Sequence, residues 1–99
     1  MYIIFLKFGA NRSQASQWAP AHMEWVQGGI DSGALLLAGS LENAQGGVVL
    51  AAQMSREALT RWLDDDPFVA NSVVTPEIHP VTPSRMADGM AALLDSQSV

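Results

Sequence analysis

Hydrophobic residues follow a strand pattern in three places in the first half of the chain. Residues 2–8, YIIFLKF, are rich in β-branched and aromatic side chains, which favours a strand. Because both faces of this segment are apolar through Leu6, we expect it to lie in the centre of a sheet. Two further apolar runs, 34–40 and 47–54, are joined by a short, polar, glycine-rich connection. Such a connection predicts an antiparallel hairpin.

The segment between the first strand and this hairpin has the apolar periodicity of a helix. Within residues 15–31, apolar side chains recur on one helical face at Ala19, Met23, Val26 and Ile30. Pro20 lacks an N–H and clashes with the preceding turn inside a helix, whereas it fits the first turn. We therefore expect the regular helix to begin near Ala19 or Pro20, or to have a short turn before a kink. Gly33 suits a left-handed stop after the helix.

The second half of the chain predicts a helix, a strand and a terminal helix. Ser55 is placed to cap the start of a helix whose apolar face comprises Ala58, Leu59, Trp62 and Leu63. Residues 72–81 contain two prolines, which cannot donate to a strand ladder, so we expect this strand to lie at an edge or to bend at the prolines. Residues 84–95 predict a terminal helix with an apolar face of Met86, Met90, Leu93 and Leu94.

The order of these elements is strand, helix, strand, strand, helix, strand, followed by a tail. This is the split arrangement of ferredoxin-like α+β folds, in which four antiparallel strands carry two helices on one face of the sheet. The other sheet face then has no cover from its own chain. Since an exposed apolar sheet face normally marks an interface, we expect a homodimer packed through this sheet face.

Composition and charge narrow the class of protein. The chain has 99 residues, a length typical of one domain, and its 48% hydrophobic and 15% charged residues indicate a globular protein. The net charge is −5, Lys7 is the only lysine, and the arginines are scattered. Nucleic-acid binding needs a basic patch, so we expect neither a nucleic-acid partner nor binding to an anionic membrane surface.

The N-terminal apolar stretch, residues 1–10, lacks the charged leader and the long apolar region of a signal peptide. No run approaches the roughly 20 apolar residues of a membrane span, so we expect a cytoplasmic protein. The absence of cysteine excludes disulfides, a thiolate nucleophile and thiolate metal sites. The composition carries no signature of a bound cofactor.

Two histidines are the first candidates for proton transfer. His22 lies roughly 70° from the centre of the apolar stripe of its helix, with Trp18 and Trp25 about one turn to either side. Two interpretations stay open: a half-buried histidine with access to a pocket, or one packed at the helix edge and bonded to a carbonyl. We expect His79 to be structural or exposed. Neither histidine has a second ligand at metal spacing, so a metal site is not expected.

Residues 64–69, DDDPFV, place three aspartates directly before a proline. Two carboxylates at the end of the preceding helix oppose its dipole. Asp is favoured just before a helix that begins with Pro, so Asp66 is predicted to be an N-cap ahead of Pro67. A capping carboxylate is also held in place by backbone N–H groups, so capping and catalysis are compatible.

Three segments taken together resemble the YCII-related proteins, a family of small domains of about this length. These are APAHMEW with His22, SGALLLAGS with Gly33 and Gly39, and DDDPFVANSVV with Asp66, Pro67 and Phe68. The resemblance runs from YIIFLKF through EIHPV and covers most of the chain. It implies a ferredoxin-like domain, here residues 1–82, that forms a dimeric α/β barrel, with residues 83–99 as an added helical tail.

The resemblance also implies an active site built on a characteristic histidine and aspartate, which correspond here to His22 and Asp66. Asp66 would orient and charge the imidazole, and His22 would abstract or donate a proton near neutral pH. The pocket for a small-molecule ligand would be walled by the apolar side chains of Trp18, Trp25 and Phe68. Many relatives carry an arginine three residues before the histidine, where this chain has Ala19; if that arginine anchors an anion, this protein binds a different substrate.

Two functions stay open at this point. One is a small cofactor-independent lyase or isomerase that uses general acid–base chemistry on a small compound, aromatic or not. A family member removes chloride from a hydroxylated chloro-aromatic ring, and muconolactone isomerase has a similar fold. The other is a non-catalytic dimeric module that binds a ligand or serves as an accessory domain. The feature that separates them is whether His22 and Asp66 converge on one open cavity.

Overall fold

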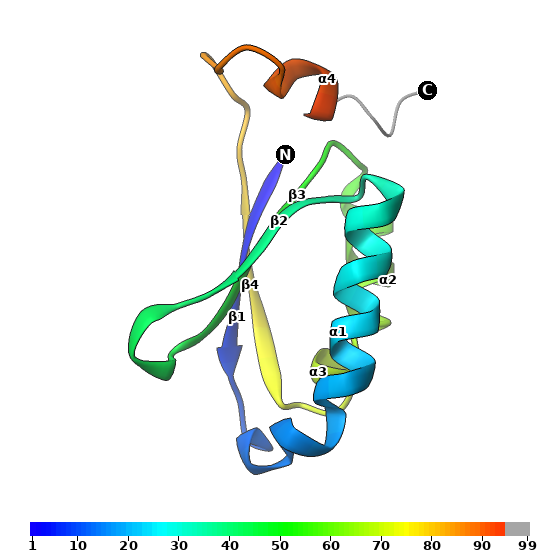
Figure 1. The fold of residues 1–99 in the computed structure, drawn as a ribbon, viewed down its shortest axis with the longest axis vertical. Coiled ribbons are helices and arrows are strands. Elements are labelled where there is room, and N and C mark those ends of the chain that lie inside the picture. The colour runs from blue at the N-terminus through cyan, green and yellow to red at the C-terminus, as the bar shows by residue number, and fades with distance from the viewer. Residues whose placement is uncertain (95–99) are drawn as a thin grey trace.

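The computed structural model describes residues 1–94, which form one four-stranded antiparallel sheet with helices (Figure 1). The order of strands in the sheet is β2-β3-β1-β4, so the predicted central place of the first strand and the edge place of the last are confirmed. The predicted hairpin is formed by β2 and β3. The elements are β1 (Tyr2–Phe8), α1 (Ala15–Ser32), β2 (Leu35–Ser40), β3 (Gly46–Ala51), α2 (Arg56–Asp64), α3 (Pro67–Ala70), β4 (Val74–Pro80) and α4 (Met90–Leu94).

The helices α1, α2 and α3 lie on one face of the sheet, which we call the inner face (Figure 1). Alternate residues of the central strands point toward them, because successive side chains of a strand alternate between faces. Ile4 and Leu6 of β1 are almost fully buried there, together with Leu59 and Leu63 of α2. Ser55 caps α2 by accepting a hydrogen bond from the Ala58 N–H, as predicted. This layer of helix on sheet is the core of the domain.

The opposite, outer face of the sheet is covered by no helix of the described residues. Its apolar centre comes from β1, β2 and β3 and consists of Ile3, Phe5, Leu37, Val48 and Leu50. Leu37 is 49% exposed, and the other members are partly buried. A polar cluster of Lys7, Glu77 and His79 follows the β4 edge. The outer face is therefore apolar in its centre and charged along one edge.

The start of α1 differs from the prediction. The helix begins at Ala15, directly after a 3₁₀ turn at Arg12–Gln14, and Pro20 lies inside it. The proline ring costs the helix one hydrogen bond, to the carbonyl of Ser16. Both Pro20 and Ser16 are exposed, so water can satisfy that carbonyl, and the helix continues through the proline. The predicted stop is confirmed, because Gly33 adopts a left-handed φ of 84° after the helix.

The C-terminal segment forms a shorter helix than predicted. Helical structure covers Met90–Leu94 rather than 84–95, because Gly89 has a φ of +91°, which ends any helix coming from before it. Leu94 is buried and its carbonyl accepts a hydrogen bond from the Gln53 N–H (3.3 Å). Met86 and Leu93 are exposed, so the predicted apolar face does not dock as a unit. Residue 95 of that prediction lies outside the described residues.

Candidate active site

The three consecutive aspartates have different environments. α2 ends at Asp64, and both Asp64 and Asp65 are exposed, whereas Asp66 is 0% exposed. Asp66 has an extended backbone, and its Oδ1 accepts a hydrogen bond from the Phe68 N–H at 3.0 Å. Pro67 occupies the first position of α3. The predicted N-cap is therefore confirmed, and it fixes a buried carboxylate at the junction of α2 and α3.

His22 reaches this carboxylate from the middle of α1. Its Nδ1 lies 2.8 Å from Asp66 Oδ1, and its side chain is 14% exposed. An ionised carboxylate only accepts hydrogen bonds, so Nδ1 carries a proton and donates it. In the neutral ring Nε2 is then the free acceptor. The second carboxylate oxygen, Oδ2, is buried without a hydrogen-bond partner among the described residues, so the hydrogen bonds of this carboxylate come from His22 and the Phe68 N–H, both to Oδ1.

Two aromatic rings lie close to the imidazole. The Phe68 ring stacks on His22 with the centroids 4.0 Å apart and the planes within 4° of parallel. The Trp25 ring has its centroid 6.0 Å from that of the imidazole, with the planes 26° apart. Trp25 itself is held by stacking on Trp62 at 4.2 Å and by donating from Nε1 to the Trp62 carbonyl at 3.1 Å. The Phe68 stack and the hydrogen bond to Asp66 together orient the imidazole ring.

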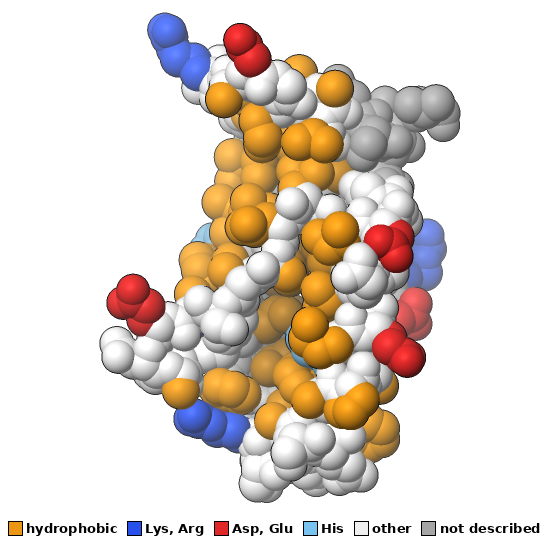
Figure 2. Space-filling model, in the orientation of Figure 1, with side chains coloured by type: hydrophobic (Ala, Val, Ile, Leu, Met, Phe, Trp, Pro, Cys, Tyr) orange, Lys and Arg blue, Asp and Glu red, His pale blue; other side chains and the backbone are white. Residues whose placement is uncertain are grey.

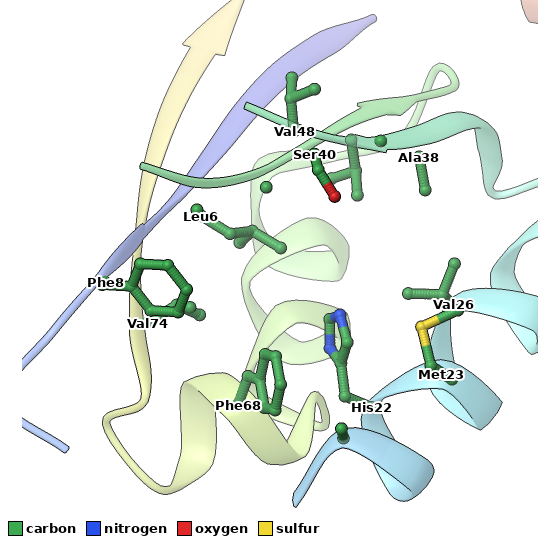
Figure 3. A pocket seen from close by; sticks show the side chains of 15 residues that line it. Leu6, Phe8, His22, Met23, Val26, Ala38, Ser40, Val48, Phe68 and Val74 are labelled. Atoms are coloured by element: carbon green, nitrogen blue, oxygen red, sulfur yellow. The ribbon is translucent and has the colours of Figure 1, made fainter. Parts of the chain in front are cut away.

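A pocket of about 450 Å³ opens beside the imidazole, between α1, α3 and the β2–β3 hairpin (Figure 3). In the space-filling view, hydrophobic side chains gather around a hollow between the hairpin and α1 (Figure 2). This volume suits a small organic molecule. The residues that line it are Leu6, Phe8, Ala19, His22, Met23, Val26, Ala38, Gly39, Ser40, Gly46, Gly47, Val48, Val49, Phe68 and Val74.

The predicted pocket wall needs a correction. Phe68 and His22 line the pocket, but Trp18 and Trp25 are not among its lining residues in the described chain. At 100° per residue, both tryptophans lie on one side of His22, by roughly 40–60°, while Ala19 and Val26 lie on the other by similar angles. The apolar stripe that includes Ala19 and Val26 therefore faces the pocket. The tryptophans lie on the far side: Trp25 stacks on Trp62, and Trp18 donates to the Gln14 side chain at 3.3 Å.

Sequence reasoning missed the hairpin side of the pocket. Its glycines were interpreted as part of the connection of a hairpin, and Ser40 was not singled out. A usable signal is the register of the sheet, since Ser40 pairs with Gly47, and Gly47 pairs with Leu6 of the inner face. Residues paired across strands share a face, so all three belong to the pocket side.

The described residues contain neither a cluster of metal ligands nor a helix that could span a membrane. In residues 1–94 there is no group of three or more histidine, cysteine, aspartate or glutamate side chains placed to hold a metal ion. Across the same residues, every helix is too short or too polar to cross a bilayer.

Comparison with known proteins decides the family. The model of the YCII-related domain matches residues 1–83. The chain belongs to the YCII-related family. The resemblance carried by the three sequence segments is therefore confirmed. No curated protein matched the chain.

Among solved structures, the YCII-related chain is similar to the 5-chloro-2-hydroxyhydroquinone dehydrochlorinase TftG from Burkholderia phenoliruptrix AC1100, in complex with 2,5-dihydroxybenzoquinone. The TM-score is 0.67, the sequence identity is 10%, and the match covers 83% of this chain and 94% of that chain. At this identity the likeness establishes the shared fold. The predicted α+β class with a four-stranded antiparallel sheet is thus confirmed.

Proposed function

We propose that this protein is a small enzyme that performs general acid–base chemistry of the lyase or isomerase type on a small molecule, without a bound cofactor. One observation carries the proposal: a buried histidine–aspartate pair, 2.8 Å apart, that borders an apolar pocket of about 450 Å³. In this proposal His22 and Asp66 are the catalytic residues, and Phe68 is a substrate-binding residue.

In the proposed reaction His22 Nε2 removes a proton from the substrate, and Asp66 stabilises the resulting imidazolium. The electron pair left by the proton then forms a double bond. In an elimination, that step expels a leaving group with its bonding electrons. In an isomerisation, the imidazolium returns the proton to a different atom of the same substrate. The name of the similar solved enzyme, a dehydrochlorinase, supports the elimination.

The test is a turnover screen of chlorinated hydroquinones and unsaturated lactones, followed by release of chloride or by the absorbance of the product. We expect His22→Ala to lower the rate by about 10²- to 10⁴-fold, because the base is removed. His79→Ala is the matched control, since this histidine lies on the outer face and is exposed. An active compound that His22→Ala turns over at the parent rate would rule out the proposed base. A ligand that binds without turnover would instead favour the non-catalytic module.

The second part of the proposal is a homodimer joined through the outer sheet faces. The apolar centre of this face, with Leu37 49% exposed, has no cover from the described chain. We expect sedimentation at micromolar concentration to give twice the chain mass of 10.6 kDa. Leu37→Asp places a charge in that centre and should yield monomer, whereas Arg61→Asp, on the exposed side of α2, should leave the dimer intact. A parent protein that sediments as a monomer would contradict this arrangement.

A further inference from the structure

The polar groups of the pocket restrict the chemical class of its ligand; this inference rests on the site of the proposed function. Among the fifteen lining residues of Figure 3, His22 and Ser40 are the two with polar side chains. The others are glycine, alanine, valine, leucine, methionine and phenylalanine. No lysine, arginine, aspartate or glutamate of the described residues lines the pocket. A ligand therefore meets two polar side-chain contacts in an otherwise apolar surrounding.

Ser40 lies at the end of β2, on the hairpin side of the pocket, across from His22. Its Cα pairs with Gly47, which pairs in turn with Leu6 of the inner face. Figure 3 shows its hydroxyl directed into the pocket, toward the side on which His22 lies. The hydroxyl has no hydrogen-bond partner among the described residues. It can therefore both donate to and accept from a ligand.

The charge around the pocket disfavours an anionic ligand. The carboxylate of Asp66 is buried directly behind His22. The guanidinium of Arg12 is engaged elsewhere: it lies 4.2 Å from the centre of the Phe8 ring and donates to the Ala44 carbonyl at 3.3 Å. A carboxylate placed in the pocket would lose water without gaining a lysine or arginine partner, which is costly. A neutral ligand loses far less.

Two hairpin glycines, Gly46 and Gly47, line the pocket near Ser40. A Cβ at Gly46 would lie 2.1 Å from the Leu6 carbonyl oxygen, and its φ is +123°, so this position must stay glycine. At Gly47 the closest contact of an added Cβ would be the Gly39 carbonyl oxygen at 3.2 Å, which is a tight contact. These two residues therefore present backbone to the pocket, and a side chain at residue 47 would both narrow it and press on the Gly39 carbonyl.

We infer that the pocket binds an uncharged molecule of one or two rings, oriented by a hydrogen bond between an oxygen of the ligand and Ser40 Oγ. His22 and Ser40 then contact different edges of the same ligand. Ser40 is a specificity-determining residue, and Gly47 sets the size that is accepted. An anionic analogue of the same shape is rejected for lack of a cation.

The experiment compares 4-hydroxybenzamide with 4-hydroxybenzoate, which share one ring and differ in charge. Dissociation constants come from amide chemical-shift titrations at neutral pH in the parent protein, Ser40→Ala and the control Ser16→Ala, which alters an exposed residue of α1. We expect the amide to bind at least ~10-fold more tightly than the carboxylate. Ser40→Ala should weaken the amide by about 3- to 10-fold, the loss typical of one hydrogen bond, and Ser16→Ala should leave it unchanged. Gly47→Ala should weaken a two-ring amide more than the one-ring amide.

Three results would overturn the inference: tighter binding of the carboxylate, an unchanged dissociation constant in Ser40→Ala, or no binding of either compound at millimolar concentration. Tighter binding of the carboxylate that is lost in Arg12→Gln would assign the pocket to anions held by Arg12. These results are separate from catalysis, because the titration needs no turnover. If neutral compounds bind but no compound of the turnover screen reacts, the proposed function is contradicted and this inference stands. If only carboxylates are turned over, this inference is contradicted and the proposed function stands.

Discussion

The described residues contain two histidine–carboxylate pairs whose N–O distances are nearly the same and whose surroundings differ. His22 and Asp66 approach to 2.8 Å with side-chain exposures of 14% and 0%. His79 and Glu77 approach to 2.9 Å with exposures of 50% and 45%. The first pair joins α1 to α3 beside a pocket, whereas the second lies along the edge strand β4 of the outer face. Burial and an adjacent cavity, rather than a short N–O distance, therefore distinguish a candidate site.

Solvent weakens the exposed pair. Hydrogen bonds from His79 and then from Lys7 hold the pKa of Glu77 below its usual value of 4.5. Water and salt screen these contacts, and exposed ion pairs contribute little to stability. In the buried pair, by contrast, little water reaches the contact between His22 and Asp66, and the Phe68 N–H also donates to the carboxylate.

The largest expected difference is in stability after removal of each carboxylate. Asp66→Ala should lower the free energy of unfolding by roughly 0.5–2 kcal/mol, because α3 loses its cap. His22 loses its partner in the same variant. Glu77→Ala should leave the midpoint of urea unfolding nearly unchanged. Asp66→Asn separates the two roles, since asparagine still caps a helix. Equal midpoints for Asp66→Ala and Glu77→Ala would remove the distinction between the pairs.

A smaller effect is the pH dependence of the exposed pair. Because the pKa of Glu77 is lowered in the folded state, its contribution to stability is present above about 4.5 and is lost as the pH falls through the folded value. The melting temperature of the parent should therefore slightly exceed that of Glu77→Gln near pH ~6, and the gap should close by pH ~3. Added salt should also close it. A gap that widens on acidification would contradict this sign.

The smallest effect concerns the exposed neighbours of Asp66. Asp64 ends α2 and Asp65 follows it, so both charges lie at the negative end of the helix dipole. Replacing Asp65 with Asn should raise the free energy of unfolding by roughly 0.3–1 kcal/mol. Chemical denaturation of Asp64→Asn and Asp65→Asn measures this, with Asp66→Asn as the buried comparison. A clear loss of stability in Asp65→Asn would show a structural role that its exposure does not indicate.

The sequence predicted the fold well because its signals are local. Apolar runs, β-branched residues and the turn residues between them placed the strands, and the Asp66–Pro67 pair predicted the cap of α3. His22 was placed at the border of its helix, but its pairing with Asp66 came from family resemblance, because no local pattern joins residues that far apart. The tryptophans were misassigned because a border residue has apolar neighbours on both sides. Ser40 was missed because strand register decides which face it occupies.

The stack of Trp25 between His22 and Trp62 has a spectroscopic consequence. Indole fluorescence responds to polar and charged groups within a few ångströms, and the imidazole ring lies 6.0 Å from Trp25. A ligand that hydrogen-bonds the far edge of the imidazole changes the electric field at the indole, although it does not touch Trp25. The tryptophan emission should therefore shift as the pocket fills, and Trp25→Phe should remove most of the change. The fold thus contains an internal optical probe of its own site.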